Sequence, residues 1–137
     1  MRLSYFLPAI GWFILSFVLL VLPGNDLPHN DLFNIPYFDK YVHFAMFFLL
    51  TTLFCYPVFY SSTDEPARYR WFVAVALFVV VYGTAMEFVQ KYLVYGRSFD
   101  LVDIVFDTLG SVAGLLAIGV YYRKKIGPNR NRGRNQN

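Results

Sequence analysis

Apolar residues fall into four long blocks separated by short polar stretches. The blocks run from about Tyr5 to Leu22, Tyr41 to Tyr60, Trp71 to Tyr95 and Leu101 to Tyr122. Each block can cross a hydrocarbon core of about 30 Å, because a helix rises about 1.5 Å per residue. The apolar positions are continuous and do not follow one face, which is typical of membrane spans. The pattern predicts an all-α fold, an integral membrane bundle of four transmembrane helices.

The first block is predicted to be a retained spanning helix and not a cleaved signal peptide. Arg2 is the only charge before it, and no small-x-small cleavage site follows it. Its apolar run is also longer than the roughly 7–15 residues of a signal-peptide core.

Composition supports a membrane protein of one domain. Charged residues make up 15% of the 137 residues, against about 25% in a typical soluble domain. The single cysteine, Cys55, cannot form an internal disulfide, and its apolar neighbours predict a small buried side chain.

The positive residues predict the orientation. With four spans, nine of them share a side with both termini: Arg2, Arg68, Arg70, Arg123, Lys124, Lys125, Arg130, Arg132 and Arg134. Only three, Lys40, Lys91 and Arg97, lie on the other side. Because cytoplasmic loops carry the excess of Lys and Arg, we expect a multi-pass protein of the cell membrane, plasma or inner, with both termini cytoplasmic.

The last residues differ from the rest of the chain. Residues 123–137 are basic, rich in Asn and without an apolar period. We expect a disordered cytoplasmic tail after a membrane domain of residues 1–122. Beside a spanning helix, such a tail is expected to contact anionic lipid and not nucleic acid.

Three ionisable residues lie at similar depths in different blocks. His43 is 17 residues before Tyr60, and Glu87 is 17 residues after Arg70, each about 26 Å along a helix. Asp107, 16 residues before Arg123, is about 24 Å along. Ionisable groups inside a bilayer are costly and usually functional. Their common depth predicts one polar site near the outer surface.

Helical spacing predicts that further polar residues face the same site. The expected faces are Asp39 with His43, Gly83 with Glu87 and Gln90, and Asp103 with Asp107, Gly110 and Gly114. The Gly-xxx-Gly pair allows a neighbouring helix to approach closely. A purely structural alternative stays open, in which Glu87 pairs with Lys91 while Asp39 and Asp103 sit among lipid head groups.

The same residues resemble a known family pattern. Segment 39–44, Asp-Lys-Tyr-Val-His-Phe, is similar to the Asp-Lys-x-x-His-Phe motif of the VanZ-like family. Glu87-x-x-Gln90, Arg97-x-x-Asp100-x-x-Asp103 and Gly110-x-x-x-Gly114 follow in the family's order and spacing. Family members often have Asn where this chain has Asp107. The resemblance implies a small polytopic membrane protein tied to a bacterial cell envelope.

Two functions are compatible with such a site. In the first, the protein is an accessory factor that binds a lipid or lipid-linked envelope component. Arg97 would pair with a phosphate or carboxylate, because its planar fork can donate two hydrogen bonds. The ligand-binding residues would be Asp39, Lys40, His43, Glu87, Gln90, Arg97, Asp100, Asp103 and Asp107.

In the second, the protein is an intramembrane hydrolase or transferase acting on an envelope lipid. His43 would be its general base or acid and Glu87 its acid partner. His43, Glu87, Asp103 and Asp107 could hold a divalent ion, but the spacing matches no recognised metal motif, so we expect no metal and no cofactor. Proton-coupled transport is disfavoured because polar residues are missing from the cytoplasmic half of the spans, and a homo-oligomer stays open.

Overall fold

The described part of the protein contains four α-helices and no strand. The computed structural model describes residues 3–22, 37–59 and 64–134. A short 3-10 helix, Leu3–Phe6, leads into α1 (Leu7–Val21), which is followed by α2 (Phe38–Phe59), α3 (Glu65–Leu93) and α4 (Leu101–Arg134). His29 and most of the first loop lie outside the described residues.

Each of the four helices is long and apolar enough to cross a membrane. The spanning stretches are Ser4–Val21, Phe38–Val58, Pro66–Leu93 and Leu101–Lys125. Large apolar side chains are exposed along every helix, including Leu77, Val81 and Leu116, each more than 60% exposed. A soluble monomer rarely exposes such continuous apolar surface, so the predicted four-helix membrane bundle is confirmed.

Three helix boundaries differ from the sequence prediction. α2 begins at Phe38 and not at Tyr41, and α3 begins at Glu65 and not near Trp71. Both helices therefore extend by polar turns beyond their apolar cores. Pro66 suits the first turn of α3, because proline lacks a backbone N–H and the N–H groups of a first turn have no partner within the helix. α4 continues as a helix to Arg134, through residues for which we expected no regular structure. Lys and Arg are good helix formers and are favoured near a helix C-terminus.

Helices α2 and α4 form the closest pair of the bundle. A Cβ added to Gly110 would lie 2.3 Å from the Phe44 carbonyl oxygen, and one added to Gly114 would lie 2.7 Å from that of Phe48. Only glycine allows the two backbones to come so near, as the Gly-xxx-Gly spacing predicts. The acids Asp103 and Asp107 lie on this same buried side of α4.

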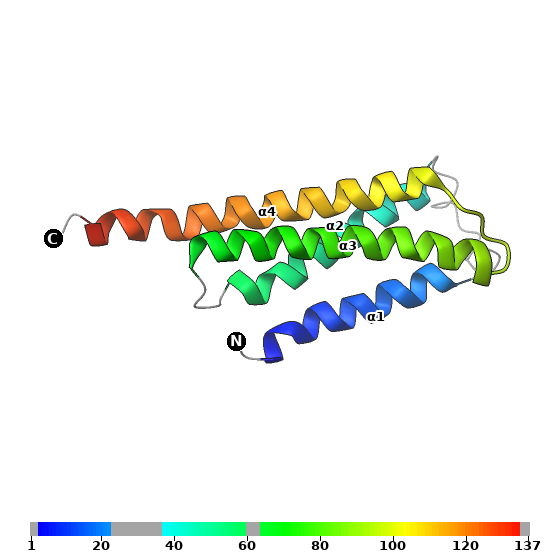
Figure 1. Ribbon diagram of the computed structural model, residues 1–137, viewed down its shortest axis with the longest axis horizontal. Coiled ribbons are helices and arrows are strands. Elements are labelled where there is room, and N and C mark those ends of the chain that lie inside the picture. Colours follow the sequence, from blue (N-terminus) through cyan, green and yellow to red (C-terminus); the bar gives the residue numbers. More distant parts are fainter. Residues whose placement is uncertain (1–2, 23–36, 60–63, 135–137) are drawn as a thin grey trace.

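Helix α1 is attached to the bundle by side-chain hydrogen bonds. Trp12 Nε1 donates to the Met46 carbonyl of α2 at 3.0 Å, and Gln90 Nε2 of α3 donates to the Leu20 carbonyl at 2.9 Å. An apolar core that includes Leu20, Phe47 and Met86 packs between α1, α2 and α3. The α3–α4 connection lies at one end of the bundle and the two chain termini at the other (Figure 1).

Candidate functional site

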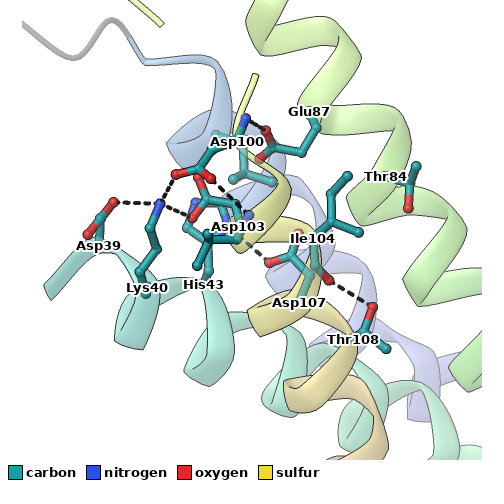
Figure 2. Close-up of polar contacts among 12 residues, drawn as sticks. Asp39, Lys40, His43, Thr84, Glu87, Asp100, Asp103, Ile104, Asp107 and Thr108 are labelled. Carbon is teal, nitrogen blue, oxygen red and sulfur yellow. Dashed lines mark hydrogen bonds and ion pairs between the residues drawn. The ribbon is translucent and has the colours of Figure 1, made fainter. Parts of the chain in front are cut away.

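The three residues predicted at one depth, His43, Glu87 and Asp107, meet Lys40 and Asp103 at the end of the bundle that carries the α3–α4 connection. Lys40 and His43 come from the first turns of α2, Glu87 from the last turns of α3, and Asp103 and Asp107 from the first turns of α4. All five are buried, with residue exposures of 7% or less. Figure 2 shows their side chains directed toward one another. The predicted convergence is therefore observed, while ligand binding by these residues stays a prediction.

Lys40 is the cation at the centre of the site. Its Nζ lies 2.5 Å from Asp100 Oδ2, 2.6 Å from Asp103 Oδ1 and 3.1 Å from Asp39 Oδ2. The sequence analysis placed Asp39 on the inner face with His43, but the Asp39 side chain is 59% exposed and Lys40 is the buried neighbour. The three-residue spacing of Lys40 and His43 puts both on the face that meets α4.

Asp100 joins three segments of the chain. Its Oδ1 accepts the Val102 N–H at 2.8 Å, which caps the start of α4. Its own N–H donates to Glu87 Oε2 at 3.0 Å, and its other carboxylate oxygen binds Lys40. The Lys40 ammonium, together with the Val102 N–H, holds the pKa of the Asp100 carboxyl below its usual value. The positive end of the α4 helix dipole favours the same acids.

A second pair lies one turn deeper along α4. His43 Nδ1 is 2.9 Å from Asp107 Oδ1. Because an ionised carboxylate can only accept, Nδ1 carries a ring proton and donates it to Asp107. Gly83 of α3 makes room for this pair, since a Cβ there would come within 2.7 Å of Asp107 Oδ2 and of the Phe47 ring.

Glu87 does not pair with Lys91, which was the structural alternative for this residue. Glu87 is 1% exposed and accepts from the Asp100 backbone. Lys91 is exposed, and its Nζ lies over the rings of Tyr92 and Phe99 instead of beside Glu87. The carboxylate of Glu87 is therefore directed into the bundle, toward α4.

A cavity of about 130 Å³ opens beside this cluster, between α1, α2 and the α3–α4 connection. Apolar side chains form most of its wall, and its charged or titratable lining residues are Asp39, His43 and Arg97. The Nε of Arg97 is buried and has no hydrogen-bond partner among the described residues. Gly96, with φ 76°, makes the turn that precedes Arg97, a conformation that favours glycine.

Three of the buried side chains could share an ion. One ligand atom from each of His43, Glu87 and Asp103 lies within 4.8 Å of the other two. These residues come from α2, α3 and α4, so only the folded bundle brings them together.

The sequence analysis missed polar residues that lie deeper in the bundle. Thr51 Oγ1 donates to Ser111 Oγ at 2.9 Å, and Ser111 Oγ donates to the Ala76 carbonyl at 3.2 Å. These two hydrogen bonds connect α2, α4 and α3 below the charged cluster. Short hydroxyl side chains are common in spanning helices. The one available signal was helical spacing, since Ser111 follows Asp107 by four residues on α4 and Thr51 follows His43 by eight on α2. No feature of the sequence indicated that Leu19 and Leu20 of α1 line the cavity.

Comparison with known proteins identifies the class of this membrane bundle. The family model described as VanZ/LLP1 matches residues 5–122. That match includes most of each of the four spans and every residue of the cluster, so the chain belongs to the VanZ/LLP1 family.

One relative extends the comparison to a eukaryote. The chain is 34% identical over 110 residues to an uncharacterized protein of the fission yeast Schizosaccharomyces pombe. The matched region covers 80% of this chain and 64% of the yeast protein, slightly less than two thirds of its length. No solved structure matches the chain. Because this relative is fungal, the comparison does not establish a bacterial origin or a role in a cell envelope.

Proposed function

We propose that the protein binds the polar head group of a membrane lipid, or of a lipid-linked envelope component, in the cavity beside His43. The observation that carries this proposal is Arg97, whose buried Nε lacks a hydrogen-bond partner among the described residues and whose side chain lines a mostly apolar cavity. A buried donor without an acceptor is costly, and a phosphate or carboxylate oxygen would satisfy it. The apolar wall suits the adjoining part of the lipid.

The charge distribution supports a proposal for the side of the membrane that the site faces. We place the protein in the plasma or inner membrane with both termini in the cytoplasm, because the Lys and Arg excess favours that side. The cavity then opens toward the outer leaflet. The role is that of an accessory protein of the envelope, and the basic residues that follow the last span contact anionic lipid.

Lipid retention tests this proposal. The full-length protein, purified in mild detergent, is expected to carry a phosphate-containing lipid that native mass spectrometry identifies. Arg97→Ala should lose most of that lipid, since it removes the only proposed donor to the head group. Lys91→Ala is the matched control, because Lys91 is an exposed cation at the same end of the bundle. Equal lipid content in wild type and Arg97→Ala would contradict the proposal.

A second function is favoured by one specific contact. The hydrogen bond between His43 and Asp107 resembles in chemistry the pairs that orient a histidine for general base catalysis, and Glu87 lies nearby as the acid partner. An enzyme would convert the bound lipid. Conversion by wild type, lost in folded His43→Gln and Glu87→Gln, would favour catalysis over binding alone.

A further inference from the structure

We propose that His43, Glu87 and Asp103 bind one divalent transition-metal ion, of the Zn²⁺ or Mn²⁺ type. The first observation is the meeting of their ligand atoms within 4.8 Å. Ligands around such an ion, at about 2.0–2.2 Å from it, lie roughly 3–4 Å apart, so small side-chain rotations close the site. One imidazole and two carboxylates suit these ions.

The second observation concerns how each of the three side chains is held. His43 uses Nδ1 for Asp107, Glu87 uses Oε2 for the Asp100 N–H, and Asp103 uses Oδ1 for Lys40. Each residue therefore has one polar atom engaged by an orienting partner. Its other atom has no hydrogen bond in the part of the chain that the structure describes. Metal ligands are typically oriented in this way by a second set of residues.

The third observation is an imbalance of buried charge. Glu87, Asp103 and Asp107 are three carboxylates with residue exposures of 6% or less. Lys40 is the one buried ammonium beside them, since Arg97 forms no ion pair among the described residues. With all three carboxyls ionised and His43 neutral, two negative charges are left, and buried charge is unfavourable unless it is compensated. A divalent cation supplies two positive charges at the point where these side chains meet.

The ion would leave room for a ligand of its own. Three protein ligands leave at least one coordination position open, as in metal sites that bind a substrate or water. His43 also lines the cavity that contains Arg97, so the ion lies next to the proposed head-group site. The proposal does not rest on lipid binding, because its readout is the ion itself.

Direct metal analysis tests the proposal in the full-length protein. The protein is stripped with a chelator in detergent, dialysed against micromolar Mn²⁺ or Zn²⁺, and its metal content is measured. We expect one ion per chain. Pulsed electron paramagnetic resonance of the Mn²⁺ form should show coupling to an imidazole nitrogen in the wild type, a result that needs no variant.

Variants then assign the ligands. Glu87→Gln and Asp103→Asn should weaken binding by about tenfold or more, and Asp107→Asn, which alters the partner of His43, by about 10–100-fold. His43→Gln should lose the nitrogen coupling. Asp64→Asn is the control, because Asp64 is an exposed carboxylate at the start of α3, before the first turn of that helix. A wild type that holds no ion, or one without nitrogen coupling, overturns the proposal and leaves protons as the compensating charge. Equal affinity in Glu87→Gln, Asp103→Asn and the control overturns it as well.

Discussion

At the scale of single residues, Lys40 has the largest predicted effect on stability. Its ammonium contacts three carboxylates from α2, the α3–α4 connection and α4. Removing one member of a buried charged group leaves the others uncompensated, and this costs more than the group contributes as a whole. The expected loss of stability therefore comes from the carboxylates that would be left without a counter-charge.

The variant Lys40→Met tests this argument. It keeps the apolar stem and removes the charge, so the free energy of unfolding should fall by about 3–5 kcal/mol. Equilibrium unfolding in mixed micelles would measure the change. Lys91→Met is the control, with an expected change within about 1 kcal/mol, since Lys91 is exposed and contacts only the faces of aromatic rings. Equal stabilities of the two variants would show that the carboxylates do not depend on the Lys40 charge.

At the scale of helices, the contact between α2 and α4 determines whether the site can form. Lys40 and His43 belong to α2, whereas Asp103 and Asp107 belong to α4. Their distances of 2.6 and 2.9 Å require the two backbones to lie close together. Gly110 provides this closeness one turn below Asp107.

The pair Gly110→Ala and Gly119→Ala tests the role of this contact on one helix. A Cβ at Gly110 would meet backbone atoms of Phe44 and Phe48, which cannot rotate away. The helices must separate, so we expect a loss of about 1–3 kcal/mol together with weaker ion binding. A Cβ at Gly119 meets nothing within 4 Å, and alanine there should leave stability unchanged or raise it by up to about 1 kcal/mol. Thermal unfolding of the two proteins makes the comparison, and similar losses in both would contradict a special role for Gly110.

At the scale of the whole molecule, the end of the bundle that holds the site should face outward. The α3–α4 connection and the start of α2 lie at that end, away from both termini (Figure 1). The Lys and Arg excess lies at the other end. A site that faces outward would meet lipids of the outer leaflet.

Cysteine labelling in intact cells tests this orientation. In a Cys55→Ala background, Ser98→Cys should react with an impermeant thiol reagent, because Ser98 is exposed in the α3–α4 connection. Asp64→Cys, at the exposed start of α3, should react only after the cells are permeabilised. The reverse pattern would place the site on the cytoplasmic side.

The sequence alone determined the number of spans, the family and the end of the bundle where the polar residues gather. Hydropathy and depth depend only on position along a chain of fixed rise per residue, so both can be read without contacts. The spacing of Gly110 and Gly114 also predicted the close face of α4. The site residues were named, but their partners were not.

The tertiary structure decided which side chains meet. It pairs Lys40 with Asp103 and His43 with Asp107, and it brings α1 to the wall of the cavity beside Arg97. These contacts depend on the rotation of each helix and on the order of the helices around the bundle. A span that is apolar on every side carries little information about either, because lipid and protein neighbours suit such a surface almost equally well.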